Sequence, residues 1–275
     1  MPELPETETI ARDLDRELRG RTFTHVVVRQ SDVLREVTAA ALRRRVVGAA
    51  IMRAWRRAKC VVLDLSTSDR IVVQPRFTGA LLLSAGSLPE REAAYSTLHF
   101  ALDDARDLHY RDIRRLGTVA LMSPTRFHDY AGTLGVEPLD PAFTASHLSV
   151  LLRGSRQAVK KVLMDQRVVA GIGNIYANEA CWRAGVDPSR AARTLGDADV
   201  AALHRGIVSV LTESIAARGT SFRDYVDASG GKGGFERSLA VYGRGGERCL
   251  RCGARLVETH AIDGRTTVLC AHCQK

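Results

Sequence analysis

Four cysteines near the carboxyl terminus have a spacing that suits metal binding. They form two Cys-x-x-Cys pairs separated by seventeen residues, Cys249 with Cys252 and Cys270 with Cys273. Two such pairs at this separation are typical of zinc sites, because four thiolates complete a closed tetrahedron around one ion. No coordination position would stay open for a substrate, so the pattern predicts one structural Zn²⁺ and no catalytic metal.

The segment between the two cysteine pairs is predicted to be a β-hairpin. Strand-like runs at 254–262 and 263–269 meet at Asp263-Gly264, a dipeptide that favours tight turns. Arg265 stands at or beside the tip of this hairpin. One interpretation is a solvated turn arginine, and the other is a guanidinium that contacts a phosphate.

A glycine-containing stretch at 163–180 predicts two helices joined by a short turn. It reads LMDQRVVAGIGNIYANEA, with Gly171 and Gly173 at the turn and Asn174 as the expected cap of the second helix. Backbone N–H groups at such a helix start can bind a phosphate. The alternative is an ordinary packing element, but Lys160 just upstream favours the phosphate interpretation.

The charge of the chain favours a polyanionic partner. The formal net charge is +9, and Lys59 is the only lysine among the first 159 residues. Such a balance suits nucleic acid. No apolar run is long enough for a transmembrane helix, and the acidic start does not resemble a signal peptide. We therefore expect a cytosolic protein.

The hydrophobic pattern divides the chain near residue 135. Ile10, Leu14 and Leu18 predict an amphipathic first helix. Strand-like runs follow, with one short helical candidate at 38–45, and they predict a sandwich or barrel. They lie at 24–30, 46–55, 59–66, 70–77, 79–84, 97–104, 107–112 and 117–123. Helices are predicted later, at 144–152, 155–165, 174–184, 196–217 and 220–227, and a mobile loop is predicted at 227–238.

In this order and spacing the motifs resemble the formamidopyrimidine-DNA glycosylase / endonuclease VIII family. The resemblance covers nearly the whole chain, and the start PELPE is closer to the formamidopyrimidine-DNA glycosylase branch. The motifs that carry it are PELPETET, RRAK, DIRRLG, GVEPL, LMDQRVVAGIGNIYANE, VYGRGGERC and the final CAHCQK.

The resemblance implies an α+β, multi-domain fold. Residues 1–134 would form an N-terminal β-sandwich catalytic domain with an N-terminal helix. Residues 135–239 would form a helix–two-turn–helix DNA-binding domain, and residues 240–275 a zinc-finger hairpin. The implied partner is damaged double-stranded DNA, bound by a monomer in the cytoplasm, associated with the nucleoid.

The resemblance also implies roles for residues at the start of the chain. Pro2, once Met1 is removed, would be the nucleophilic amine. Glu3 would be the acid/base beside it, and Glu6 would support the pocket. Lys59 would hold a phosphate close to the lesion and serve catalysis as a fixed cation.

Further DNA contacts are implied for residues distributed along the chain. Asn174 and Arg265 would bind phosphates that flank a flipped nucleotide, with Arg265 close enough to serve catalysis, and Lys160 is a weaker candidate for the same strand. The side chains that fill the vacated stack depart from the family pattern. Phe77 stands where methionine is usual, and Arg115 precedes Leu116 where phenylalanine is usual. Phe77 could instead belong to the sandwich core.

The expected activity is that of a bifunctional DNA glycosylase/AP lyase of base-excision repair acting on 8-oxoguanine and formamidopyrimidines. One alternative is the same chemistry on oxidised pyrimidines or abasic sites. Another is a zinc-ribbon protein that binds damaged DNA without catalysis. The segment 220–238, where the damaged base would be read, carries no signature that decides the lesion.

Overall fold

The computed structural model describes residues 2–86, 88–221 and 225–275, and its chain forms two compact units. The first unit comprises Met1–Gly132 and Ala217–Gly234, and the second comprises Thr133–Ala216 and Phe235–Lys275. The return of 217–234 to the first unit was not predicted. The domains predicted at 1–134, 135–239 and 240–275 are defined by function, and they stay a prediction. The two units are defined by which residues pack together.

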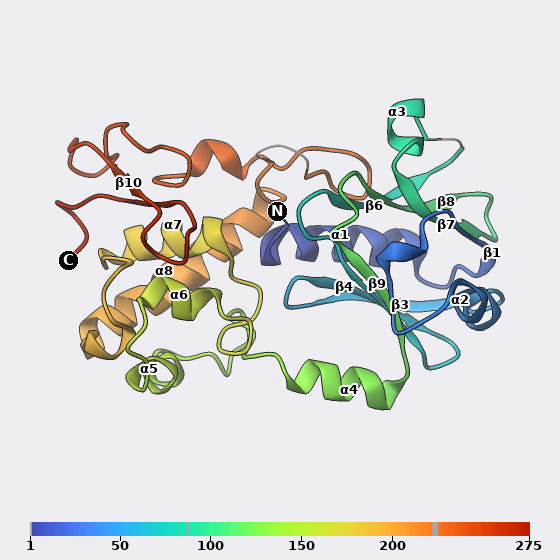
Figure 1. The fold of residues 1–275 in the computed structure, drawn as a ribbon, viewed down its shortest axis with the longest axis horizontal. Coiled ribbons are helices and arrows are strands. Elements are labelled where there is room, and N and C mark those ends of the chain that lie inside the picture. Colours follow the sequence, from blue (N-terminus) through green and yellow to red (C-terminus); the bar gives the residue numbers. More distant parts are fainter. Residues whose placement is uncertain (1, 87, 222–224) are drawn as a thin grey trace. The chain divides into compact units, whose positions relative to one another are not determined.

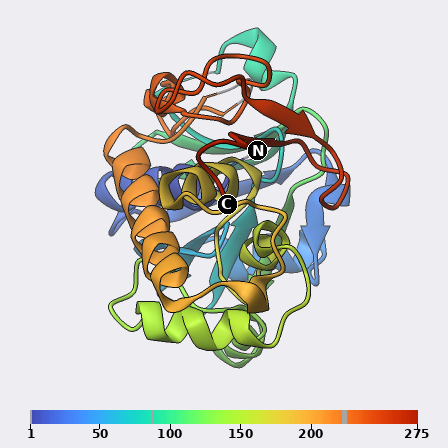
Figure 2. The same ribbon diagram turned by 90° about the vertical axis from the view of Figure 1, so that its left-hand side faces the viewer.

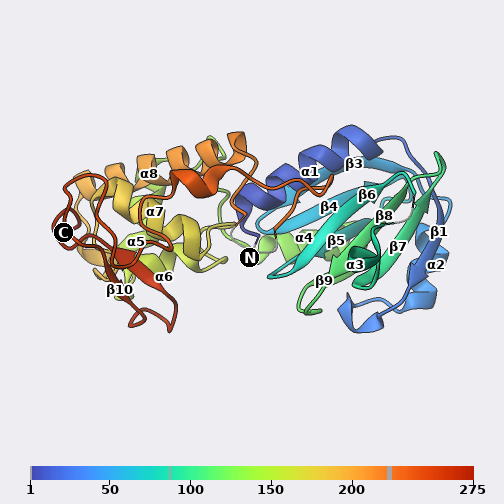
Figure 3. The same cartoon turned by 90° about the horizontal axis from the view of Figure 1, so that it is seen from above.

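The first unit contains two stacked sheets, which Figures 1 and 3 show. The four-stranded sheet is antiparallel in the order β1 (Phe23–Val28), β7 (Ser96–Leu102), β8 (Asp107–Asp112) and β6 (Gly79–Ser84). The five-stranded sheet has the order β2 (Leu34–Arg35), β9 (Thr118–Met122), β5 (Arg70–Gln74), β4 (Cys60–Leu65) and β3 (Ile51–Arg57). In this second sheet β2 runs parallel to β9 and the other pairs are antiparallel.

One hydrophobic core joins both sheets to the first helix. Buried residues of the two sheets form a single cluster with Ile10, Leu14 and Leu18 of α1 (Leu4–Leu18), each of which has no exposed surface. The predicted stripe on this helix is therefore confirmed, and α1 packs against β3 and β4. Removing this apolar surface from water stabilises the unit and fixes the start of the chain against the sheets.

Three further helices accompany the sheets. These are α2 (Ala39–Val46), α3 (Glu90–Ala93) and α4 (Pro124–Gly132), with a 3₁₀ turn η1 at Ser31–Val33. The prediction at 38–45 is confirmed by α2, whereas α3 and α4 were not predicted. The strand predicted over 46–55 begins only at Ile51, because α2 continues to Val46 and the chain turns at Gly48, whose φ is 83°.

The second unit is helical and carries the cysteine hairpin. Its helices are α5 (Ala145–Arg153), α6 (Val159–Met164), α7 (Asn174–Ala184) and α8 (Asp197–Ala216), which confirm the predictions at those places. Helix α7 packs against α6 and α8, as Figure 2 shows. Short 3₁₀ turns η2 (Ala192–Thr194) and η3 (Phe235–Ser238) and the strands β10 (Val257–Thr259) and β11 (Thr267–Leu269) complete it.

The helix predicted at 220–227 is wrong. Thr220 forms an antiparallel bridge with Gly234, and residues 225–227 have no helical structure; residues 222–224 lie outside the described part. Arg218 and Gly219 adopt left-handed φ angles of 64° and 86°, which turn the chain after α8. Tyr225 then packs in the core of the first unit. Packing against that core places this residue, and the helical spacing of apolar residues does not.

The predicted α+β architecture with a β-sandwich and a cysteine hairpin is confirmed. Among the described residues, no helix has the length and apolar character needed to span a membrane.

Candidate active site and nucleic-acid interface

The start of α1 places Pro2 and Glu3 in a buried setting. Both are buried, and Glu3 has only 1% of its surface exposed. Glu3 is the extended N-cap residue of α1, and its N–H donates to Glu6 Oε2 at 2.8 Å. This is one arm of a capping box, which fixes where the helix starts. A carboxylate is thus held one residue from Pro2.

The second oxygen of Glu6 ties the segment 217–234 to the same helix start. Thr220 N–H donates to Glu6 Oε1 at 2.8 Å. A Cβ atom on Gly219 would lie 3.0 Å from both Cγ and Oε1 of Glu6, and the φ of Gly219 is 86°, so glycine is required there. Glu6 therefore bridges two segments that are far apart in sequence.

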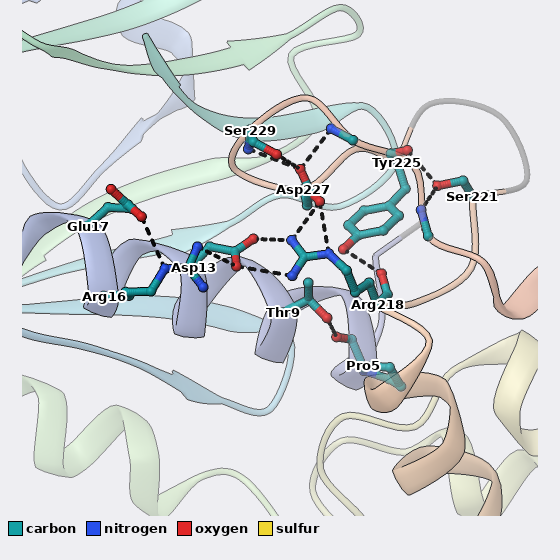
Figure 4. A network of polar contacts seen from close by, with 12 residues as sticks. Pro5, Thr9, Asp13, Arg16, Glu17, Arg218, Ser221, Tyr225, Asp227 and Ser229 are labelled. Atoms are coloured by element: carbon teal, nitrogen blue, oxygen red, sulfur yellow. Dashed lines mark hydrogen bonds and ion pairs between the residues drawn. The ribbon is translucent and has the colours of Figure 1, made fainter. Parts of the chain in front are cut away.

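Arg218 clamps the same segment to the middle of α1, as Figure 4 shows. Its guanidinium donates to Asp13 Oδ2 at 2.5 Å and to Asp227 Oδ2 at 2.6 Å. Both carboxylates are almost fully buried. Burial alone would raise the pKa of Asp227, but hydrogen bonds from Arg218 and Ser229 hold it below its ordinary value.

Lys59 lies at the tip of the hairpin between β3 and β4. Arg57 and Cys60 pair across the ladder, so Ala58 and Lys59 form a two-residue turn in which the φ of Ala58 is 52°. The side chain of Lys59 is half-buried. Because α1 packs on both strands of this hairpin, Lys59 and Pro2 are carried by elements in direct contact.

Phe77 and the DIRRLG loop form an exposed cluster in the first unit. Phe77 is 45% exposed and Leu116 is 40% exposed, so the interpretation of Phe77 as a core residue is wrong. The guanidinium carbon of Arg114 lies 5.3 Å from the centre of the Phe77 ring, a cation–π contact. Arg115 is half-exposed and donates to Gln30 Oε1 at 2.9 Å.

Asp112 and Thr78 hold these two loops together. Thr78 Oγ1 donates to Asp112 Oδ1 at 2.5 Å and accepts from Arg114 N–H at 3.0 Å. Asp112 Oδ2 accepts from Gly117 N–H at 2.8 Å and from the Tyr110 hydroxyl at 3.2 Å. All four hydrogen bonds are buried or part-buried, so the loops carrying Phe77 and Leu116 have a rigid base.

In the second unit, Asn174 binds the tip of the cysteine hairpin and does not cap α7. Gly173 is the N-cap residue, which corrects the predicted cap. The side-chain amide of Asn174 donates to Thr266 O at 3.0 Å. Gly173 has no side chain, so no side-chain cap bonds the start of α7.

The structure argues against a direct phosphate contact by Lys160. Its side chain has no exposed surface, and its ammonium donates to Thr266 O at 2.8 Å and to Thr267 Oγ1 at 2.7 Å. The neighbouring lysines at 160–161 look alike in the sequence, but α6 turns one inward and leaves the other exposed. Lys160 therefore positions the hairpin beside Arg265.

Arg265 itself is exposed at a tight turn. Its N–H donates to Ile262 O at 3.1 Å, and Asp263 and Gly264 between them have φ angles of 57° and 65°. Both angles suit the type I′ turn that the Asp-Gly pair predicts. The ladder ends earlier, at Thr259 and Thr267, so Arg265 stands in a loop held by Lys160 and Asn174.

The four cysteines converge as a zinc site requires. The Sγ atoms of Cys249, Cys252, Cys270 and Cys273 all lie within 4.8 Å of one another. The Sγ atoms of Cys252 and Cys270 are 3.5 Å apart. A tetrahedral ion with Zn–S bonds of about 2.3 Å places its sulfur ligands roughly 3.8 Å apart, so these residues fit Zn²⁺.

Comparisons with known proteins agree along the whole chain. Residues 1–119 match the Formamidopyrimidine-DNA glycosylase N-terminal domain, residues 134–226 the Formamidopyrimidine-DNA glycosylase H2TH domain, and residues 246–275 the zinc finger found in FPG and IleRS. A formamidopyrimidine-DNA glycosylase of Carboxydothermus hydrogenoformans is 40% identical, and the match covers all of both chains. The chain belongs to the formamidopyrimidine-DNA glycosylase family.

Relatives and solved structures of this family support the same conclusion. The formamidopyrimidine-DNA glycosylase of Xanthomonas campestris is 39% identical over the full length of both chains. A Lactococcus lactis FPG variant in complex with DNA containing Fapy-dG has a TM-score of 0.92 at 30% identity, covering all of both chains. The MutM (FPG) protein of Thermus thermophilus has a TM-score of 0.87 at 32% identity, covering 99% of this chain and 98% of that one.

Membership of the formamidopyrimidine-DNA glycosylase family confirms three predictions. The chain is a DNA glycosylase of the family that repairs oxidised purines, a family that also has AP lyase activity. It carries one structural zinc, because a zinc-finger match coincides with the four converging cysteines. The third is the closer likeness to the formamidopyrimidine-DNA glycosylase branch.

Sequence reasoning missed a buried carboxylate that supports this glycosylase's hairpin. Glu179 on α7 has no exposed surface and accepts three backbone N–H groups, from Ala240, Val241 and Tyr242, at 2.8–2.9 Å. Burial raises the pKa of Glu179, and the three N–H groups partly offset this. The signal in the sequence was a glutamate among the mainly apolar residues 175–181.

Proposed function

We propose that this chain excises oxidised purines, 8-oxoguanine and formamidopyrimidines, from damaged double-stranded DNA and then cuts the strand, with Pro2 as its nucleophile. The observation that carries the proposal is the buried helix start, where Glu6 fixes Glu3 directly beside Pro2. We propose that it acts as a monomer in the cytoplasm, in association with the nucleoid.

The chemistry follows from the amine of Pro2 once Met1 has been removed. A chain-terminal amine has a pKa near 7.7–8.0, so a useful fraction is neutral at cellular pH. It forms a bond to the sugar C1′ as the bond from C1′ to the base breaks, and the proton of the amine goes to the departing base. Glu3 gives a proton to the ring oxygen, the sugar opens, and the secondary amine becomes an iminium ion. Loss of the acidified C2′ hydrogen then expels the 3′ phosphate, and a second elimination expels the 5′ phosphate.

Positively charged and amide side chains hold the DNA backbone in this proposal. Lys59 contributes a fixed cation on the hairpin that packs on α1, and it stabilises the phosphate nearest the reacting sugar. Asn174 and Arg265 bind phosphates flanking the flipped nucleotide, with Arg265 exposed at its turn. Lys160 acts through the hairpin and does not touch DNA.

The cluster around Phe77 fills the stack from which the base is removed. An exposed aromatic ring on a rigid loop can insert between bases, and the Arg114 guanidinium packs over the same ring. Arg115 binds the backbone beside it. The aromatic residue stands on the loop 75–78 between β5 and β6, and Leu116 is the apolar residue of the second loop, so the aromatic side chain has moved from one loop to the other.

Borohydride trapping tests the nucleophile. The full chain, incubated with duplexes containing 8-oxoguanine or an abasic site, should give a covalent adduct after reduction. A variant with an uncleaved residue before Pro2 should give none, because its nitrogen is an amide. Pro5→Ala is the matched control: it alters the other proline of the same helix turn and should keep the adduct. No adduct from the wild-type chain on any lesion duplex would overturn the proposal in favour of a non-catalytic binder.

A panel of lesions tests the substrate class. Release of 8-oxoguanine and formamidopyrimidines should exceed release of oxidised pyrimidines under equal conditions. The reverse order would show that the chain prefers oxidised pyrimidines through the same amine.

A further inference from the structure

The four-stranded sheet of the first unit carries a second group of metal-ligating side chains, distinct from the cysteines of the second unit. His99 on β7 stands directly opposite His109 on β8, and Asp107 precedes His109 by two residues. Residues two apart on a strand share a face. Leu98, Phe100 and Leu108 belong to the core, so His99, Asp107 and His109 project from the opposite face.

These three side chains gather closely enough to share one ion. Their candidate ligand atoms all lie within 4.8 Å of one another. The imidazole rings of His99 and His109 are stacked, with centroids 4.7 Å apart and planes 7° apart. Directly opposed residues of an antiparallel pair make such an approach possible, and the pairing fixes it through the backbone.

The cluster contains buried polar atoms that lack hydrogen-bond partners in the described part of the chain. Nε2 of His109 is one, and this residue is only 6% exposed. Nε2 of His99 and Oγ of Ser84 are two others, and Ser84 stands opposite Asp107 in the pairing of β6 with β8. Buried polar atoms nearly always have partners. Nε2 of His109 and Oγ of Ser84, on adjoining strands, therefore point to a ligand, whereas Nε2 of His99 already faces Asp107 Oδ1 at 2.8 Å.

The His109 ring has the kind of second contact that orients metal-binding histidines in other proteins, a hydrogen bond at the ring nitrogen that does not bind the metal. Nδ1 of His109 lies 3.1 Å from Ser96 Oγ, which fixes the ring and leaves Nε2 for another partner. Nε2 of His99 lies 2.8 Å from Asp107 Oδ1 without the alignment of a hydrogen bond. The side chains of His99 and Asp107 are 22% and 26% exposed, so an ion can enter from solvent.

The cationic side chains beside the cluster are bound elsewhere. Arg29 donates to Ala93 O at 3.2 Å, and Arg111 pairs with Glu92 at 2.7 Å. Asp107 supplies the negative charge that a divalent cation needs, while two imidazoles supply nitrogen ligands.

We propose that His99, Asp107 and His109 form a second metal site, which binds a first-row divalent cation, in the first instance Zn²⁺. Two imidazoles and one carboxylate are a ligand set that Zn²⁺ accepts, and the Ser84 hydroxyl or water completes the tetrahedron. Zn–N bonds of about 2.0–2.1 Å bring ligand atoms to roughly 3.3 Å from one another. The ligand atoms lie within 4.8 Å of one another at present, so the two imidazoles must turn out of their stacked arrangement to reach that value around one ion.

Cobalt binding to the full chain tests the proposal. The chain is prepared with one Zn²⁺ in its four cysteines and then titrated with Co²⁺. One equivalent should bind with visible d–d bands and without the near-ultraviolet charge-transfer band of cobalt thiolates. Zn²⁺ should compete for the same equivalent, and metal analysis after gel filtration should give two ions per chain.

Two variants and one control identify the ligands. His109→Ala and Asp107→Asn should each weaken Co²⁺ binding by at least about tenfold, as expected for lost or reduced coordination. His128→Ala, an exposed histidine on α4 of the same unit, should bind like the wild-type chain. If His109→Ala does not fold, Asp107→Asn decides, since it preserves side-chain shape.

Three results would overturn the proposal. These are no uptake of a second equivalent by the wild-type chain, a thiolate charge-transfer band from the second ion, and Co²⁺ binding by both ligand variants as tight as that of His128→Ala.

Discussion

Replacing Arg218 by methionine should destabilise the first unit substantially, although the arginine is itself half-exposed. Its guanidinium lies between Asp13 and Asp227, with Nη2 2.5 Å from one carboxylate and 2.6 Å from the other (Figure 4). The side chains of these aspartates are only 6% and 5% exposed, whereas that of Arg218 is 44% exposed. Methionine keeps most of the aliphatic stem, so the change removes mainly charge and hydrogen bonds.

The size of the loss in unfolding free energy depends on the hydrogen bonds and solvent contact that the two carboxylates retain without Arg218. Removing one partner of a buried ion pair costs roughly 3–5 kcal/mol, because a buried charge is left uncompensated. Asp227 retains hydrogen bonds from Ser229 and Gly231, and water can reach the place of the exposed guanidinium. We therefore expect a loss of about 2–4 kcal/mol in the free energy of unfolding, lower than the full cost of a buried pair.

Urea unfolding followed by tryptophan fluorescence measures this loss in the right unit. The chain has two tryptophans, so Trp182→Phe leaves Trp55 on β3 as the reporter of the first unit. Arg126→Met is the matched control. Arg126 binds Glu36 with two hydrogen bonds of 2.7 and 2.8 Å, but these side chains are 44% and 46% exposed. Its loss should be much smaller than that of Arg218→Met, because both charged groups of this pair are solvated.

The comparison can refute the reasoning. If Arg218→Met and Arg126→Met cost the same small amount, burial of Asp13 and Asp227 does not make the clamp important. If the clamp matters, adding Asp13→Asn to Arg218→Met should recover about 1–2 kcal/mol, because it neutralises one uncompensated carboxylate.

Four other predictions follow from single contacts. Glu179→Gln should lower the free energy of unfolding in urea by about 1–3 kcal/mol, because its amide N–H₂ would face a backbone N–H that now donates to a carboxylate oxygen. An unchanged free energy of unfolding would contradict this. Gly117→Ala should cost at least about 2 kcal/mol, because its Cβ would lie 1.9 Å from the Tyr110 hydroxyl; wild-type stability would contradict it. Chelation of zinc should abolish amide protection in the cysteine hairpin and weaken DNA binding, and unchanged exchange after verified zinc loss would count against the site. The pKa of Asp227 is lower in the folded chain than in the unfolded chain, so its ionised form stabilises the fold above about pH 4, and this stabilisation is lost as the pH falls further. Urea unfolding between pH 5 and 3 should show the loss of folding free energy. The same pH dependence should be smaller in Arg218→Met.

Local patterns in the sequence predicted much of the fold. The stripe of Ile10, Leu14 and Leu18 predicts α1 because burial recurs at the helical period. The strands are found where apolar residues cluster, and the cysteine spacing predicts a metal site because the ligands of each pair lie three residues apart. These features depend on near neighbours in the chain, so periodicity and spacing suffice to find them.

Contacts across long sequence separations could not be predicted in the same way. Thr78 meets Asp112 across 34 residues, and Thr220 meets Glu6 across 214. Each pair depends on strand register or on the path of 217–234 back to the first unit, neither of which leaves a local pattern. The helix predicted at 220–227 fails for this reason, since long-range bonds decide the conformation of that segment.

Lys160 shows how the same limit changes the interpretation of a candidate site. In the sequence it is one of two adjacent lysines in a basic protein, and a phosphate contact is the natural expectation. In the structure its ammonium and the Asn174 amide both donate to Thr266 O, directly after Arg265. A buried cation held in this way cannot bind a phosphate, but it can fix the backbone from which an exposed arginine projects. We therefore propose that any effect of Lys160 on DNA binding passes through the position of Arg265, the exposed cation of this turn.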